Sequence, residues 1–223
     1  MSPRRFLNLG ILAPVFLQEI DVSSLLRTLG TGMVAAMSLA ATATAQSAPT
    51  QNVSTSPSFV EADATFMTGM IGHHAQAVLI AGWAPTHGAS RAIQALCERI
   101  VVGQTDEIGL MQRWLREWGK PVPSADASHD MMPGMEHMAH AMMPGMLTGD
   151  QLRELDKARG KDFDKLWLQA MIRHHQGALT MIKDLLAVPG AARDDAVFKF
   201  VSDMNADQGI EIERMSGMLS AMQ

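Results

Sequence analysis

A twelve-residue phrase that occurs twice constrains the fold of this chain more than any other feature. Residues 66–77 read FMTGMIGHHAQA and residues 167–178 read WLQAMIRHHQGA, so the second copy follows 101 residues after the first. Neither copy contains proline, and the apolar residues recur at the three- and four-residue spacing of an amphipathic helix. A long phrase repeated in this way indicates a duplicated structural unit. We therefore expect two copies of one helical unit.

A second repeated phrase extends each copy to two helices. It has the form Q-x-x-E-I-x-x-M and spans residues 104–111 and 208–215. Its Gln, Glu and Met positions share one helix face. Together with proline and glycine stop signals, the pattern predicts four principal helices, over about 58–84, 90–118, 148–187 and 194–219. The expected fold is an all-α four-helix bundle made of two helical hairpins, repeat one (58–118) and repeat two (148–223), within one domain (58–223).

The first 45 residues are typical of a secretory signal peptide. An uncharged run of small and apolar residues follows Arg27, and Ala43 and Ala45 form a small-x-small cleavage pattern. The run is shorter than the roughly 20 residues that a spanning helix needs. An uncleaved anchor is the alternative, and the sequence leaves open where the signal begins. We expect cleavage after Ala45, a flexible leader over 46–57, a periplasmic or secreted protein, and no stable membrane insertion after cleavage.

The linker over residues 119–147 has the most unusual composition in the chain. It contains the phrase MMPGM twice, at 131–135 and 142–146, with two histidines between the copies. Thioether and imidazole donors at this spacing suit a soft ion such as Cu(I), or Ag(I) as its analogue. The alternative is an adaptable apolar plug, a common use of methionine. The candidate metal ligands in this linker are Met131, Met132, Met135, His137, Met138, His140, Met142, Met143 and Met146.

The histidine pairs of the repeated phrase form a second set of candidates. Met70 and His74 are one helical turn apart, as are Met171 and His175, so each pair could offer a sulfur and a nitrogen. Adjacent helix positions point about 100° apart, so one histidine of each pair should face the core and the other a groove or solvent. The candidate ligands here are Met70, His73, His74, Met171, His174 and His175.

A metal-free interpretation of the same residues stays open. His74 and His175 could donate to Glu107 and Glu211 and so tie the two hairpins together, because buried polar groups need partners. The expected structural polar network comprises Asp63, Gln104, Glu107, Asp164, Gln208 and Glu211. Asp63 lies about 16 Å along the helix from His74, too far to share an ion with it, which favours a helix-start or inter-helix salt-bridge role.

Composition excludes several classes of function. The formal net charge of −5 and the absence of tyrosine argue against nucleic-acid binding. The single cysteine, Cys97, excludes an intramolecular disulfide and a thiolate cluster within one chain, and its apolar spacing indicates a core position. No nucleophile–base constellation or phosphate loop occurs, and the Glu-x-x-His motifs of di-iron bundles are absent from the histidine-bearing faces. We therefore expect no enzymatic activity.

The paired M-I-x-H-H phrases, the leading aspartates, the Q-x-x-E-I-x-x-M phrases and the MPGM box together resemble the bacterial domain-of-unknown-function family 305. The resemblance covers about residues 58–219 and implies a ferritin-like fold, export and an association with copper handling. It also implies that the matching positions of the two repeats are equivalent, although Gln76 departs from the glycine that stands at Gly177. The family has no settled enzymatic activity.

The sequence thus predicts an exported protein that binds Cu(I) or Ag(I) through methionine and histidine and sequesters or ferries it. A copper-efflux or copper-delivery protein would be its partner. One alternative is a metal-free structural or partner-binding module. Another is a ferritin-like metal enzyme.

Overall fold

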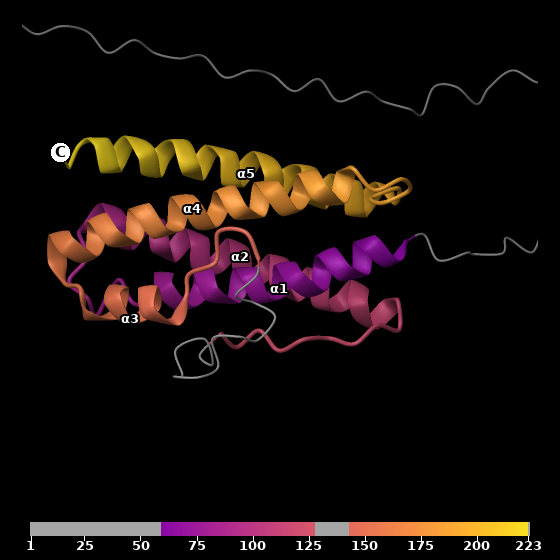
Figure 1. Cartoon of the computed structure of the whole chain (residues 1–223), viewed down its shortest axis with the longest axis horizontal. Helices are drawn as coiled ribbons and strands as arrows, with labels where there is room; N and C mark the ends of the chain where they lie inside the picture. Colours follow the sequence, from indigo (N-terminus) through magenta and orange to yellow (C-terminus); the bar gives the residue numbers. More distant parts are fainter. Residues whose placement is uncertain (1–58, 128–142, 223) are drawn as a thin grey trace, which may run out of the picture. The chain divides into compact units, whose positions relative to one another are not determined.

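The computed structural model describes residues 59–127 and 143–222, and all the regular secondary structure in this part of the chain is helical. Its helices are α1 (Glu61–Ala81), α2 (Arg91–Glu117), α3 (Gly149–Lys157), α4 (Gly160–Leu186) and α5 (Asp195–Ser220) (Figure 1). The predicted all-α class is confirmed. The predicted signal peptide (1–45) and leader (46–57), and the linker residues from 128 to 142, lie outside the described residues.

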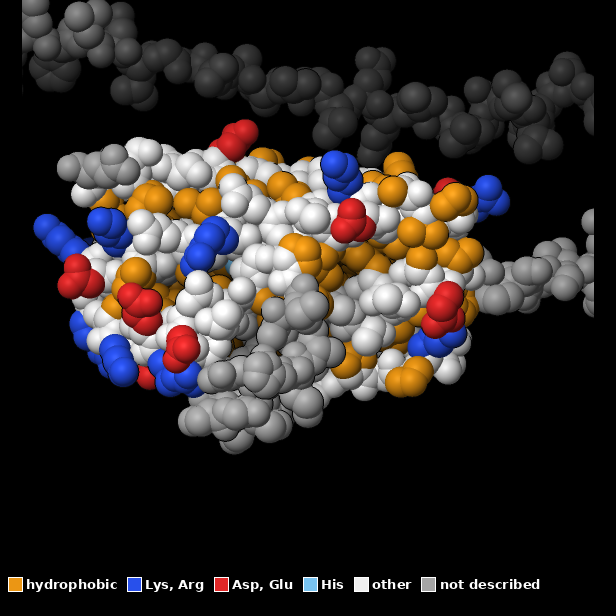
Figure 2. All heavy atoms as spheres, viewed as in Figure 1, with side chains coloured by type: hydrophobic (Ala, Val, Ile, Leu, Met, Phe, Trp, Pro, Cys, Tyr) orange, Lys and Arg blue, Asp and Glu red, His pale blue; other side chains and the backbone are white. Residues whose placement is uncertain are grey.

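The four long helices form the two expected hairpins. α1 packs against α2 and α4 against α5, and the hairpins meet mainly along α1 and α4, whereas α2 and α5 make few direct contacts (Figure 1). Basic and acidic side chains are interspersed over the described part of the face in Figure 2. None of the described helices is long and apolar enough to cross a membrane. The ferritin-like assignment stays a prediction.

Local capping explains where most helices begin. The Ser90 side chain accepts from Ile93 N at the start of α2, and Asp194 accepts from Ala196 N and Val197 N at the start of α5. Thr148 and Gln151 form a reciprocal capping box at α3. These side chains satisfy amide groups that have no partner within the helix. The predicted starts of these three helices are confirmed.

The prediction of one continuous third helix is wrong. Instead of one helix from Thr148 to about 187, the chain forms α3 and α4 with a break at Ala158 and Arg159. Gly160 has φ of +58°, a conformation that favours glycine, and its N–H donates to the His87 carbonyl at 2.8 Å. The break is therefore fixed by a contact with the turn of the first hairpin.

Two aspartates join the hairpins at their turns. Asp63 of α1 accepts from Ala192 N, in the turn of the second hairpin, at 2.7 Å. Asp164 of α4 accepts from Ser90 N, at the turn of the first hairpin, at 3.1 Å. Both carboxylates are almost completely buried. Asp63 also accepts from Val60 N at the start of α1, which confirms the expected helix-start role. Its partner in the other hairpin is a backbone N–H, so the alternative of an inter-helix salt bridge is wrong.

The apolar core has two parts, one toward each end of the long helices. One cluster is built around residues such as Phe163, Trp167 and Leu96 and includes Cys97, which is buried as expected. The other includes Phe66, Met70 and Met111. Between these clusters, near the middle of all four long helices, lie the histidines and glutamates of the repeated phrases. The core is therefore divided by a polar layer, which is the place to look for function.

Candidate metal centre

The polar layer contains four buried histidines. His73 and His74 come from α1, His174 and His175 from α4, and none is more than 1% exposed. The prediction that one histidine of each pair would lean to a groove or solvent is wrong. α1 and α4 face each other at this level, so one ring of each pair points across to the other hairpin. The second ring points toward the other helix of its own hairpin.

The outer histidines each donate to a glutamate. His74 Nε2 lies 2.7 Å from Glu107 Oε2, and His175 Nε2 lies 2.7 Å from Glu211 Oε2. Each bond joins two helices of one hairpin, α1 to α2 or α4 to α5. The expectation that these bonds tie the two hairpins together is therefore wrong. The partners belong to the same repeat because each hairpin places its two phrases side by side.

The inner histidines stack on each other between the hairpins. The ring centroids of His73 and His174 are 3.8 Å apart, with the ring planes tilted by 39°. His73 Nε2 donates to the Pro144 carbonyl at 3.0 Å, while its Nδ1 is buried without a partner among the described residues. Both ring nitrogens of His174 are buried without a partner in hydrogen-bonding geometry in this part of the chain. An unsatisfied buried polar atom costs roughly 1–3 kcal/mol, so this pair is a candidate for binding a ligand.

Burial keeps the inner pair neutral. Desolvation, reinforced by the neighbouring charge of His74, lowers the pKa of His73 to about 3. Desolvation and the neighbouring His73 lower the pKa of His174 well below its usual value. A neutral imidazole carries the lone pair that a metal ion requires, whereas a protonated one does not. The inner rings can therefore act as ligands throughout the physiological pH range.

Residues 143–147 lie over the inner histidines. Gly177 of α4 allows this approach, because a Cβ there would lie 1.9 Å from the Pro144 carbonyl oxygen. Gly145, at φ of +80°, also packs against the α4 backbone, since a Cβ there would lie 2.4 Å from the Arg173 carbonyl oxygen. On the α1 side, Gln76 Nε2 donates to Leu147 O at 3.0 Å and Gln76 Oε1 accepts from Leu147 N at 2.7 Å. We call residues 143–147 the axial segment, because they lie between the two repeats.

The predicted methionine ligands fall into three groups. Met70 and Met171 are fully buried within one helical turn of the histidines. Met143 and Met146, in the axial segment, are partly exposed. The remaining linker candidates lie outside the described residues: Met131, Met132, Met135, His137, Met138, His140 and Met142. Sequence analysis missed Met181 of α4, which approaches Met143 and belongs to neither repeated phrase.

The donor types present determine which ions fit. Within residues 59–127 and 143–222, no three side chains of His, Cys, Asp or Glu are grouped so that they could hold a metal ion. The inner imidazoles and the thioethers nearby are nitrogen and sulfur donors with no formal charge. Such donors suit Cu(I) or Ag(I) better than a hard cation.

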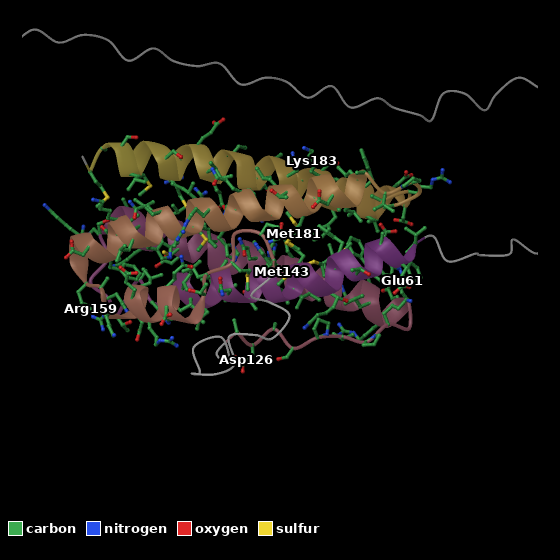
Figure 3. The ribbon with its side chains drawn as sticks, viewed as in Figure 1. Glu61, Asp126, Met143, Arg159, Met181 and Lys183 are labelled. Atoms are coloured by element: carbon green, nitrogen blue, oxygen red, sulfur yellow. The ribbon has the colours of Figure 1, made fainter. Side chains whose placement is uncertain are left out.

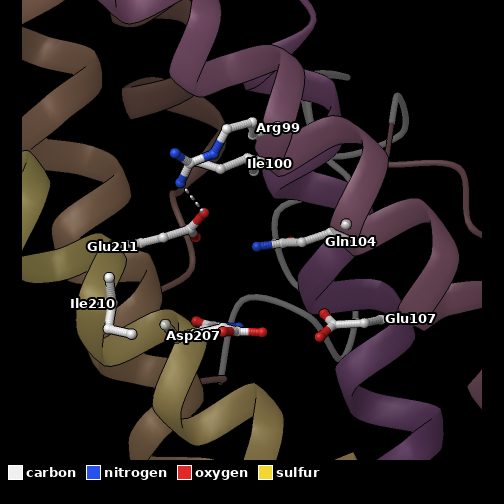
Figure 4. A pocket seen from close by; sticks show the side chains of 9 residues that line it. Arg99, Ile100, Gln104, Glu107, Asp207, Ile210 and Glu211 are labelled. Carbon is white, nitrogen blue, oxygen red and sulfur yellow. Dashed lines mark ion pairs between the residues drawn. The ribbon is translucent and has the colours of Figure 1, made fainter. Parts of the chain in front are cut away.

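On the opposite side of the histidine layer, a groove opens between α2 and α5 (Figure 4). Its volume is about 250 Å³, and its lining includes Glu107, Asp207 and Glu211, with Arg99 Nη2 3.7 Å from Glu211 Oε1. Figure 4 shows the Gln104 side chain extending from α2 toward α5.

The members of the predicted polar network are therefore not all connected. The two aspartates bond to backbone N–H groups at the turns, and the two glutamates bond to histidines. The amide oxygens of Gln104 and Gln208 are buried without a partner in the described part of the chain. The network is thus a set of separate pairs.

Comparison with known proteins links this arrangement to one family. The family described as "Domain of unknown function (DUF305)" matches residues 63–219. A putative secreted DUF305 protein from Streptomyces coelicolor has 28% identity and a TM-score of 0.60, covering 72% of this chain and 93% of that one. A DUF305 fragment from Deinococcus radiodurans has 26% identity and a TM-score of 0.61, covering 73% and 98%.

A third similar structure is that of a protein named CopM. Its Cu(I)-bound form has 26% identity and a TM-score of 0.55, covering 71% of this chain and 96% of that one. The same protein has also been solved in a Cu(II)-bound form. No protein with curated annotation matches this sequence.

Proposed function

This chain belongs to the DUF305 family, and we propose that it binds Cu(I) and Ag(I) through methionine and histidine side chains outside the cytoplasm. Its similarity to CopM, solved with Cu(I) and Cu(II), supports an association with copper. The similar protein from Streptomyces coelicolor, described as a putative secreted protein, supports export. The role is sequestration or transfer of the ion and involves no catalysis.

One observation carries this proposal: His174 is fully buried, neutral, stacked on His73, and has no hydrogen-bond partner for either ring nitrogen among the described residues. A purely structural histidine at such a position would be expected to have a partner. The free His73 Nδ1 lies in the same layer. A soft ion would bind the lone pairs of His73 Nδ1 and of the unprotonated ring nitrogen of His174, and the methionines of the axial segment supply sulfur nearby.

Thioether ligands suit copper outside the cytoplasm. A thioether does not have to lose a proton before it binds a metal, and it cannot be consumed by disulfide formation. The axial segment covers the inner histidines, so an ion held there would be shielded from solvent. Such an ion would be handed to a copper-efflux or copper-delivery protein only after the axial segment moves.

A metal-free structural or partner-binding module is the second candidate. A specific observation favours it: His74 and His175 are each bonded to a glutamate, as a structural network requires. The Nε2 atoms of these two histidines are bonded within their own hairpins, although their Nδ1 atoms are buried without a partner among the described residues. The two candidates therefore differ in the role they give to His73 and His174.

The test is an anaerobic Cu(I) titration of the full-length protein against a competing chelator, repeated with Ag(I). We expect the His73→Leu, His174→Leu double variant to lose affinity by at least tenfold. A His87→Gln variant serves as the control, because His87 is also buried but bonds to Asp156, away from this layer. If neither ion binds and metal leaves the melting temperature unchanged, the metal-free module is the correct interpretation.

A further inference from the structure

Two methionine side chains from different parts of the chain meet above Gly69 of α1. A Cβ placed at Gly69 would lie 3.4 Å from Met143 Sδ and 3.5 Å from Met181 Cε. Met143 belongs to the axial segment and Met181 to α4, and Figure 3 shows the two labelled side by side where α4 passes α1. Both side chains are partly exposed, so the contact lies at the edge of the core.

This contact has no counterpart in the second repeat. The position equivalent to Gly69 is Ala170, and the position equivalent to Met181 is Ile80, a separation of 101 residues in each comparison. Both methionine tips lie within ordinary contact distance of a Cβ added at position 69. Among the described residues, this methionine pair therefore belongs to one side of the duplicated scaffold.

We propose that Met143 and Met181 form an outer two-thioether site for Cu(I) or Ag(I), next to the buried pair His73 and His174. This rests on the proposed function. The Met181 sulfur is one bond behind the methyl carbon that touches this space, and methionine torsions are soft. Rotation about its Cγ–Sδ bond swings the methyl carbon out of this space and turns a sulfur lone pair into it, without a change in the backbone.

The neighbouring residues connect this outer site to the inner histidines. Gly69 and His73 lie one helical turn apart on the same face of α1. Pro144, which follows Met143, accepts the hydrogen bond from His73 Nε2. An ion held by the two sulfurs would therefore lie about one turn from the His73 ring. The outer site is where a soft ion first binds before it reaches the buried imidazoles.

The backbones of both ligands are already fixed, so little ordering is needed on binding. Met181 is within α4, and Met143 is held by the contacts of Pro144 with His73 and with Gly177. Two neutral sulfurs without a carboxylate favour a soft monovalent ion over Zn(II) or Cu(II). We therefore expect selectivity for Cu(I) and Ag(I) at this position.

The test uses Ag(I), which is redox-inert, and the full-length protein labelled with ¹³C at its methionine methyl groups. The methyl signals of Met143 and Met181, assigned with the Met143→Leu and Met181→Leu variants, should shift together. Each variant should lower the Ag(I) affinity of this site at least tenfold, while leucine keeps the volume of the side chain. Met218→Leu is the matched control, because Met218 is a partly buried methionine of α5 and should leave the affinity unchanged.

A Gly69→Ala variant keeps both sulfurs and adds a methyl group where they meet. It should fold at least as stably, since alanine favours a helix, but bind Ag(I) several-fold more weakly at this site. If Ag(I) binds while the signals of Met143 and Met181 stay unmoved, the outer site is wrong and the proposed function stands. If neither Ag(I) nor Cu(I) binds anywhere, both fail.

Discussion

The two repeats place equivalent histidines and glutamates in the same geometry, yet they contact the axial segment differently. In repeat two, Gly177 removes a side chain so that Pro144 and Gly145 can touch the α4 backbone. In repeat one, the equivalent residue is Gln76, whose amide pairs with both the N–H and the carbonyl of Leu147. One repeat makes room for the segment and the other binds it.

This difference follows from where the axial segment lies. His73 stacks on His174 where the repeats meet, and a single asymmetric segment covers that position. One segment cannot present the same surface to two equivalent helices, so the helices had to differ. The differences at the axial segment include Gln76, Gly177 and the methionines around Gly69, while the His–Glu bonds have the same length in both repeats. The following predictions test this difference between the two repeats.

Gly177→Ala should have the largest effect. Its Cβ would lie 1.9 Å from the Pro144 carbonyl oxygen, a backbone atom that cannot give way without moving the axial segment. We expect a loss of about 3 kcal/mol in the free energy of unfolding, measured by urea denaturation. Gly217→Ala is the control, since no atom lies within 4 Å of a Cβ added there, and it should be neutral or slightly stabilising. Equal effects of the two substitutions would contradict the close approach.

Gln76→Ala should have the next largest effect. It leaves the buried N–H and carbonyl of Leu147 without their partners. The expected loss is about 2 to 3 kcal/mol in the free energy of unfolding. Gln112→Ala is the comparison, because Gln112 makes one longer bond to a loop carbonyl, at 3.3 Å to Pro123 O. If Gln76→Ala proves as mild as Gln112→Ala, the axial segment does not depend on the first repeat.

Acid should destabilise the metal-free protein through the inner histidines. The pKa of His73 is about 3 in the folded protein, against 6.5 for an unperturbed histidine. Between pH 3 and pH 6.5 the unfolded chain therefore carries a proton on this histidine that the folded chain does not. Stability is therefore complete above pH 6.5 and falls as the pH decreases toward 3. At pH 5 the loss from His73 is about 2 kcal/mol, and His174 adds to it in the same direction. Urea unfolding at pH 7 and pH 5 measures this loss, and the His73→Leu, His174→Leu double variant should abolish most of it.

The smallest expected effect distinguishes the two inner histidines at neutral pH without metal. His73→Leu leaves the Pro144 carbonyl without its donor, whereas His174→Leu removes two ring nitrogens that have no partner in the described residues. We expect His73→Leu to be less stable than His174→Leu by about 1 kcal/mol, measured by thermal unfolding. The reverse order would indicate that His174 has the more important structural contact.

Local patterns were sufficient to predict much of the fold. The repeated phrases and stop signals predicted the helices and three of their starts, near Ser90, Thr148 and Asp194, because these depend on neighbours in sequence. The glutamate partners of His74 and His175 were predicted correctly, because the two repeated phrases lie on helix faces that pack together. Only the elements joined by these bonds were predicted wrongly, because each His–Glu pair connects two helices of one hairpin and not the two hairpins.

Contacts between distant residues could not be predicted in this way. The break before α4 depends on the His87 carbonyl, and the position of the axial segment depends on Gly177 and Gln76. The sequence did show that Gln76 departs from Gly177, but the reason is visible only when residues 143–147 are placed between the helices. Met181 belongs to no motif, so no sequence signal pointed to it.

The aspartate contacts at the turns have a consequence for how such a chain could have arisen. Because Asp63 reaches the turn beside Ala192 and Asp164 reaches the turn at Ser90, each half supplies a buried carboxylate to the other. A single half on its own would satisfy this bond only by associating with a second copy of itself. The chain therefore has the form of a fused homodimer, and its stacked histidines lie where two such copies would meet.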